Sequence, residues 1–342
     1  LKLASVKIGR QLDMSNATFM TSINADGMQV DGNLLLGNSK FAKTPSIKKA
    51  RIDGDLDLLR ARLPGLDLSG TVIGGALRLA EGQYMVEWDK TEAEAKGLVL
   101  RATRVKILQD GIDPASAGAC GAKDSWPDKL DLQGFAYDQL GAISDNPRLD
   151  LRSRDPCWYE SWLRRDPRFA YQPYQQMAGT LRALGDRERA DEVLYAARER
   201  DRRNAWEEGD CGNLIKDWPW RRADCLTATG LGILMVTVGY GIGGRTLRVL
   251  WCALGLTGLG VAFLWFSAAA RKNGPIWCVG ASLDRLLPIV VLNPEFADFF
   301  NDPPPRKRLC GWQQAYFAVH AIVGFLLGCI VVAAFAGLTQ TG

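Results

Sequence analysis

The sequence contains little of the chemistry by which metal sites and catalytic centres are usually recognised. Histidine occurs once, as His320, in a chain of 342 residues. The eight cysteines form no CxxC pair and have no histidine cluster beside them, so neither a zinc site nor a redox motif is supported. HExxH, GxSxG and P-loop patterns are missing as well. We therefore predict no catalytic, metal-binding or cofactor-binding residue, and we interpret the cysteines as structural or incidental thiols.

Charged residues are missing from three long windows in the last third of the chain. About 20 apolar residues in a helix match the roughly 30 Å hydrocarbon core of a bilayer. Aromatic residues at the ends of the windows are typical of the membrane interface. The alternative, a buried core helix, does not explain three such windows so close together. The predicted spans are 225–243, 249–270 and 315–338, with Trp251, Trp265, Trp312 and Tyr316 at their ends.

The net charge does not favour nucleic acid as a partner. It is only +4, and the basic residues are not interleaved with aromatic residues that would stack on bases.

What the first third does contain is a repeated phrase of alternating apolar residues. Its first position recurs at Ile8, Val30, Ile52 and Ile73, in steps of 22, 22 and 21 residues. Alternation with a period of two predicts strands with one buried face, whereas amphipathic helices need spacings of three and four. Stacked repeats would bury columns such as Leu34, Leu56 and Leu77. Over roughly residues 1–105 the phrase resembles that of pentapeptide-repeat-like β-solenoids. We predict a β-solenoid over 1–140, with an irregular insertion near 107–128.

The middle of the chain, 141–222, is charged and has helical spacing. Apolar residues on both sides of Gly185-Asp186 predict a helical hairpin, with Asp186 or a neighbour as the cap of the second helix. The hairpin resembles one tetratricopeptide unit, which implies a docking element. Basic residues alternate with tryptophan just before the first predicted span, and we interpret these as a membrane-surface anchor: Lys216, Trp218, Trp220, Arg221 and Arg222.

Taken together, the repeats, the hairpin and the apolar end are similar to bacterial proteins described as membrane-associated oxidoreductases. This resemblance implies an oxidoreductase activity, but no residue pattern of the sequence supports it.

One phrase resembles the selectivity filter of potassium channels, in which stacked carbonyl oxygens replace the water around the ion. It consists of Thr237, Val238, Gly239, Tyr240 and Gly241. The charged residues before it do not supply the outer helix of such channels. The simpler interpretation is a helix that ends in a glycine-rich turn.

Polar residues of the membrane domain, 223–342, are the remaining site candidates. A full crossing by the segment 276–288 would place Asp284 and Arg285 near the bilayer centre, where unpaired charges are costly. We therefore predict a helix that lies at the interface or re-enters the membrane, in which the two residues pair with neighbours or line a water-filled vestibule. For His320 we favour a hydrogen-bonded structural role over a proton relay.

The predicted fold class is multidomain α and β, with an N-terminal β-solenoid, a central helical hairpin and a C-terminal α-helical transmembrane bundle. The predicted function is a membrane-anchored scaffold or sensor that binds a protein partner through the solenoid or hairpin. The alternatives are a pore or channel-like effector and, third, an oxidoreductase. A homo-oligomer is compatible with all three. Basic residues flanking the first and third spans favour a bacterial inner-membrane protein with a cytoplasmic soluble part and reduced cysteines.

Overall fold

The computed structural model describes the chain at residues 1–81, 84–89, 97–116, 120–141, 150–209, 211, 223–242, 245, 248–287, 292–301 and 309–335. It divides into two compact units, Leu1–Ala197 and Arg198–Gly342. The boundary lies within one helix, α3 (Arg187–Glu208). Each unit is described by itself.

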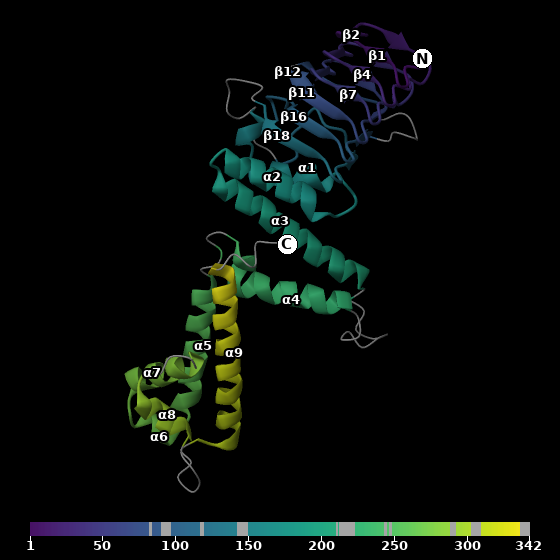
Figure 1. Ribbon diagram of the computed structural model, residues 1–342. Coiled ribbons are helices and arrows are strands. Elements are labelled where there is room, and N and C mark those ends of the chain that lie inside the picture. The colour runs from purple at the N-terminus through teal and green to yellow at the C-terminus, as the bar shows by residue number, and fades with distance from the viewer. Residues whose placement is uncertain are drawn as a thin grey trace. The chain divides into compact units, whose positions relative to one another are not determined.

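Short parallel strands build most of the first unit (Figure 1). The nine-stranded sheet contains β1 (Lys7–Ile8), β2 (Leu12–Asp13), β4 (Gln29–Val30), β5 (Leu34–Leu35), β7 (Arg51–Ile52), β8 (Leu56–Asp57), β11 (Val72–Arg78), β16 (Arg104–Gln109) and β18 (Ala136–Leu140). The four-stranded sheet has the order β14 (Glu87–Trp88), β9 (Arg62–Leu63), β6 (Lys40–Phe41) and β3 (Thr18–Phe19). The smaller sheets are β10 (Gly65–Asp67), β15 (Gly97–Val99) and β17 (Leu130–Asp131), and the antiparallel pair β12 (Ala80–Glu81) and β13 (Tyr84–Met85).

The strands pair in the register that the repeated phrases indicate. Leu34 lies opposite Leu56, and Leu56 opposite Leu77. All three side chains are completely buried. Equivalent residues of successive repeats therefore stack in one apolar column, which a single repeat is too small to bury alone.

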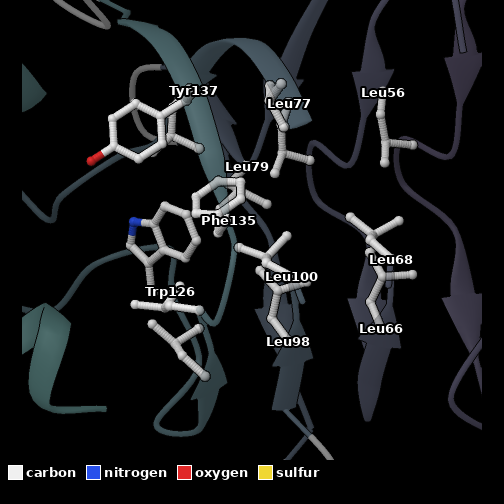
Figure 2. Packing of buried hydrophobic residues seen from close by; sticks show 14 of the residues in the cluster. Leu56, Leu66, Leu68, Leu77, Leu79, Leu98, Leu100, Trp126, Phe135 and Tyr137 are labelled. Carbon is white, nitrogen blue, oxygen red and sulfur yellow. The ribbon is translucent and has the colours of Figure 1, made fainter. Parts of the chain in front are cut away.

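Neighbouring columns fill the interior between the sheets. Figure 2 shows Leu66 and Leu98 in one column and Leu68 and Leu100 in another, both facing the column of Leu56 and Leu77. Trp126, from the insertion, belongs to the same core. Burial of these columns stabilises the unit, because each leucine buried from water contributes about 1.5–3 kcal/mol.

Each repeat turns through a residue with left-handed backbone. One corner contains Gly27, Lys49 and Gly70, with φ of 69°, 51° and 72°. Glycine adopts this conformation at little cost, whereas a side chain there costs about 1–2 kcal/mol. Ser5 and Ala102 lie at the same corner in other repeats, with φ of 59° and 52°, so Lys49 is one of several strained residues there.

The predicted β-solenoid is wrong as a fold class, because the parallel sheets form an open α/β arrangement without solenoid closure. In the four-stranded sheet the stacking of repeats stops earlier than in the other sheets. β15 and β17 extend the three-stranded sheet, and β16 and β18 extend the nine-stranded one, but no described strand follows β14. After β16 the chain passes through the insertion and returns to the other two sheets as β17 and β18, without adding a described strand to the four-stranded sheet.

Helices and side chains cover the last strands of the other two sheets. The helices concerned are α1 (Pro156–Arg164) and α2 (Tyr171–Ala183). Leu130 donates its N–H to the carbonyl of Arg165 at 3.1 Å, and Leu132 donates to Asp166 Oδ2 at 2.8 Å. Along β18, Gln172 Nε2 donates to the carbonyl of Phe135 at 2.8 Å and Gln176 Nε2 to that of Tyr137 at 2.6 Å. Three side chains and the backbone carbonyl of Arg165 thus satisfy backbone groups that another strand would otherwise pair.

The predicted hairpin corresponds to α2 and α3, with Gly185 at φ 85° between them. Asp186 accepts a hydrogen bond from the N–H of Arg189 at 3.0 Å, so it caps α3.

The second unit is helical. Its elements are the end of α3, α4 (Ala223–Val238), the 3-10 turn η3 (Gly239–Gly241), α5 (Arg248–Trp265), α6 (Ala268–Arg271), α7 (Pro275–Leu286), α8 (Pro294–Asn301) and α9 (Gly311–Phe335).

Small residues allow α5, α7 and α9 to pack closely. A Cβ on Gly260 of α5 would collide with Ser282 Oγ, and one on Gly324 of α9 would collide with the carbonyl of Leu286. The ring of Phe263 stacks on that of Tyr316, with the centroids 3.8 Å apart. The three helices therefore form one packed group with its own apolar cluster.

The predicted transmembrane bundle is also wrong. Among the described helices only α5 is long and apolar enough to cross a bilayer. The helix at the first predicted span, α4, is shorter than the apolar run of the sequence. It ends at Val238 because Gly239 and Tyr240 have φ of 58° and 60°. Its 16 residues cover about 24 Å, less than the roughly 30 Å hydrocarbon core.

Candidate functional site

Two adjoining pockets of the first unit form a groove beside β14. The larger has a volume of about 590 Å³ and is lined by Trp88 of β14, by Lys123, Asp124 and Trp126 of the insertion, and by Arg165 after α1. The smaller, of about 490 Å³, is lined by Asn38, Lys40, Arg60, Arg62 and Tyr84. Both include Met85 and Glu87, so the pockets are continuous. We call them together the β14 groove.

The floor of the groove includes the open edge of the four-stranded sheet. Glu87 donates its N–H to the carbonyl of Ala61 and Asp89 to that of Leu63, both at 2.8 Å, so these residues face β9. Alternate residues of a strand direct their backbone groups to opposite sides. The N–H and C=O of Trp88 and the carbonyl of Val86 therefore point away from β9, and within the described ranges they have no hydrogen-bond partner.

The smaller pocket is basic. Arg62 Nε is 2.5 Å from Glu87 Oε2. The guanidinium of Arg60 lies 3.5 Å from the centroid of the Tyr84 ring, a cation–π contact that leaves its N–H groups available at the edge. For Lys40 and Arg60, no carboxylate partner is found in the described part of the chain. This half of the groove can bind an anion.

The far wall of the groove is fixed by ion pairs that link the insertion to the helices. Arg165 forms a bidentate pair with Asp124, at 2.8 and 2.7 Å, and donates to the carbonyl of Trp126 at 3.1 Å. Trp158 Nε1 donates to the same carboxylate at 3.0 Å. Paired donors of this kind fix orientation as well as distance, so the wall is held in one position.

A second, completely buried pair lies behind that wall. Both nitrogens of the Arg154 fork are 2.7 Å from the carboxylate of Asp110, which also accepts from Trp126 Nε1 at 2.6 Å. The side chains are 2% and 0% exposed, and Arg154 stacks on Trp158 at 4.0 Å. Burial raises the pKa of the Asp110 carboxyl, and the Arg154 charge opposes that rise. The pair is costly to disrupt and is not accessible to a ligand.

A disulfide also anchors the insertion. Cys120 is bonded to Cys157 near the start of α1, and Cys211 is bonded to Cys225. The interpretation of these four cysteines as structural or incidental thiols is therefore wrong, as is the expectation that the cysteines before the first predicted span are reduced. Cys120, Asp155 and Cys157 form the one group of metal-ligand type among the described residues, but the sulfur atoms of this group are bonded to each other.

The polar candidates of the second unit make local hydrogen bonds. Asp284 is buried and accepts from the N–H of Leu292 at 2.7 Å. Arg285 lies over the ring of Phe300, 5.4 Å from its centroid, and its Nε has no partner among the described residues. His320 is 2% exposed and lies 3.3 Å from both the Tyr316 hydroxyl and the carbonyl of Ser282. The structure thus brings His320 to α7, but it does not bring Asp284 and Arg285 into an ion pair.

The filter-like phrase forms the end of a helix. Thr237 and Val238 are the last residues of α4, and Gly239, Tyr240 and Gly241 form η3. Thr237 donates its hydroxyl to the carbonyl of Ile233 at 2.7 Å. The buried Tyr240 hydroxyl is 3.2 Å from Glu199 Oε2. The phrase here ties α4 to the end of α3.

The predicted membrane-surface anchor falls outside the described residues: Lys216, Trp218, Trp220, Arg221 and Arg222.

No motif of the sequence indicates the β14 groove or the residues that support it. These residues include Asp110, Asp124, Arg154 and Arg165, which pair across 41 to 44 positions of the chain. One signal was present: the insertion interrupts the repeats and carries both an acidic residue and a tryptophan, Asp124 and Trp126. Acidic and aromatic residues in an interruption of a repeat are typical of a binding loop.

The groove combines features that suit binding: open backbone groups, a basic pocket and the half-buried ring of Trp88. Comparisons of the chain with protein-family models, with curated proteins and with solved structures found no match.

Proposed function

We propose that the protein is a membrane-associated binding protein, a scaffold or sensor. In this proposal the unit Leu1–Ala197 recognises a protein partner through the β14 groove, and the unit Arg198–Gly342 contacts lipid.

The observation that carries the proposal is the exposure of large apolar side chains on the second unit. Trp251 on α5 is 76% exposed and Ile276 on α7 is 87% exposed. Apolar residues on α9, including Val319, Ile322 and Leu326, are exposed too. Water-soluble monomers rarely expose apolar patches of this extent, which mark protein or membrane contacts.

The burial of α5 favours lipid over a soluble core. A core helix of a soluble protein has most of its surface covered, but only 17% of the apolar window of α5 is buried. The face that remains is rich in leucine and tryptophan: Leu250, Trp251, Leu254 and Leu259. Acyl chains cover such a face without a polar penalty. The proposal assigns lipid contact to the unit and does not require several crossings.

Flotation with liposomes tests lipid contact. The full chain, purified in detergent and then mixed with vesicles of phosphatidylcholine and phosphatidylglycerol, is expected to float with them and to resist carbonate extraction. Substitution of Trp251 and Leu254 by Lys should weaken flotation, and the matched pair Arg51→Lys and Lys106→Arg on the first unit should not. A wild-type protein that stays monodisperse without detergent and does not float would overturn lipid contact.

Crosslinking tests partner recognition in the groove. A photoreactive residue in place of Lys123, within the groove, is expected to crosslink a defined protein in cells. The matched control replaces Lys106, which is exposed on β16 outside both pockets. The proposal fails if the two positions give the same products.

The disulfides bear on the compartment. Disulfides persist in oxidising compartments and are rare in the cytosol, so the two pairs oppose the cytoplasmic placement and favour the other side of the membrane. Thiol alkylation in intact cells measures this: the proposal expects Cys120 and Cys157 to resist labelling until a reductant is added. Immediate labelling would instead indicate that the first unit lies in the cytoplasm.

A further inference from the structure

We propose that the β14 edge binds an extended peptide segment of the partner as an additional parallel strand. This inference rests on the proposed function and names how the groove recognises its partner. The bound segment would take the place of the strand that the four-stranded sheet lacks.

The position of the groove within the sheet is the first support. The two repeats that follow β14 contribute strands to the other sheets but none to this one. The larger pocket, lined by Glu87 and Trp88, therefore lies at the edge where the next strand of this sheet would pair. Neighbouring strands are about 4.8 Å apart, so a pocket of about 590 Å³ accommodates a few residues of extended chain.

The second support is that the edges of the other two sheets have hydrogen-bond partners, whereas part of the edge at β14 has none among the described residues. Arg165 and Asp166 satisfy the edge at β17, and Gln172 and Gln176 satisfy the edge at β18. At β14 the N–H of Val86 donates to the carbonyl of Leu79 at 2.9 Å. The carbonyl of Val86 and both backbone groups of Trp88 have no partner among the residues that the structure describes. An uncovered edge of this kind is the template that peptide-binding domains use for strand addition.

The hydrogen-bond pattern of the sheet predicts which peptide groups bind. Lys40 donates its N–H to the carbonyl of Ala17, and Ala42 donates to that of Phe19, both at 2.9 Å. In the same register, two alternate amides of the ligand would donate to the carbonyls of Val86 and Trp88. The Trp88 N–H would donate to the ligand carbonyl between them. The amide of the intervening ligand residue points away from the protein.

The side-chain columns predict the composition of the ligand. Inward residues of this sheet are Phe19, Phe41, Leu63 and Trp88, and the rings of Phe19 and Phe41 stack with centroids 5.0 Å apart. The ligand residue above Trp88 is therefore aromatic or aliphatic. The outward column runs Lys40, Arg62, Glu87, so the ligand residue beside Glu87 is basic.

A peptide with the sequence of residues 38–43 of this chain, Asn-Ser-Lys-Phe-Ala-Lys, meets these requirements, because it forms β6 in the same sheet. The probe is this peptide with fluorescein at its N-terminus, titrated with the full chain in detergent and followed by fluorescence anisotropy. Saturable binding is expected.

Methylation of single peptide amides distinguishes strand addition from general adhesion. N-methylation of the first lysine amide removes a donor to Val86 and should weaken binding by about tenfold or more. N-methylation of the phenylalanine amide, which points away from the protein, is the matched control and should change the affinity by less than about twofold. Both peptides leave the protein unaltered, so misfolding cannot explain the difference.

Two variants of the protein test which edge of the four-stranded sheet binds the peptide. Trp88→Ala should weaken the peptide, while Phe19→Ala, on the opposite edge strand β3, should not. Equal effects of the two methylations, loss of binding only in Phe19→Ala, or no binding at all would overturn strand addition at β14. The proposed function would survive that result if Lys123 in the groove still crosslinked a partner, and it would fail separately if the crosslink were missing.

Discussion

The buried pair of Asp110 and Arg154 gives the sharpest test of how the groove is held. Arg154→Met keeps the length of the side chain but removes the charge and both 2.7 Å hydrogen bonds to Asp110. Asp110 is completely buried and would retain only the Trp126 N–H as a partner. Leaving a buried charge uncompensated costs about 3–5 kcal/mol, so we expect unfolding of the first unit to become easier by that amount.

The pair itself stabilises less than this value suggests, because both charges lose their hydration on burial. Asp110→Asn combined with Arg154→Met removes both charges and retains an acceptor for Trp126. We expect the double variant to cost about 1–3 kcal/mol less than the sum of the single variants. The exposed pair of Arg51 and Asp53, with side chains 70% and 43% exposed, is the control. Arg51→Met should cost less than about 1 kcal/mol.

The assay is hydrogen exchange of the full chain at increasing urea concentrations, followed by mass spectrometry on peptides that cover β17 and β18. These strands lie between the insertion and the helices, so their opening free energy reports on the pair. High salt should change the cost of Arg51→Met but not that of Arg154→Met, since buried pairs are screened little. Additive effects of Asp110→Asn and Arg154→Met would refute the reasoning.

Three further predictions concern other parts of the chain. Leu56→Ala should destabilise the first unit by about 2–5 kcal/mol, measured by the same exchange experiment, because it opens a cavity in the apolar column. Lys49→Gly should leave the stability of the first unit unchanged or raise it by up to about 1 kcal/mol. Gly70→Ala at the same corner should lower that stability by about 1–2 kcal/mol. Hydrogen bonds from Arg202 lower the pKa of Glu199, so its stabilising contribution exists above the unfolded pKa and is lost as the pH falls through the folded value. In thermal denaturation, Glu199→Gln should accordingly unfold more easily than the wild type at pH 7, and this difference should shrink as the pH falls below the unfolded pKa; a difference that does not change with pH would contradict this.

Local patterns of the sequence predicted the strand register but not where the stacking stops. The alternation around Leu34 and Leu56 is visible because each strand repeats the same period. The end of the four-stranded sheet depends instead on the path of the insertion, whose partners Arg154 and Arg165 lie about 40 residues further along the chain. No periodicity reports contacts over such a separation.

The same limit applies to the helices and cysteines. Composition predicted a first span over 225–243, but α4 ends at Val238 because Gly239 and Tyr240 adopt positive φ. Hydropathy does not detect backbone conformation. The pairing of Cys120 with Cys157 spans 37 positions and depends on the insertion reaching α1. Spacing alone does not identify such a pair.

The glutamines of α2 have a consequence for synthesis of the chain. Until Gln172 and Gln176 emerge and dock, β18 presents unpaired carbonyls and a row of apolar side chains. An edge of that kind invites pairing with the same edge of another nascent chain. A protein truncated before Tyr171 would therefore be prone to aggregate even though every strand of its sheets is present, and α2 would act as the element that ends growth of the sheet.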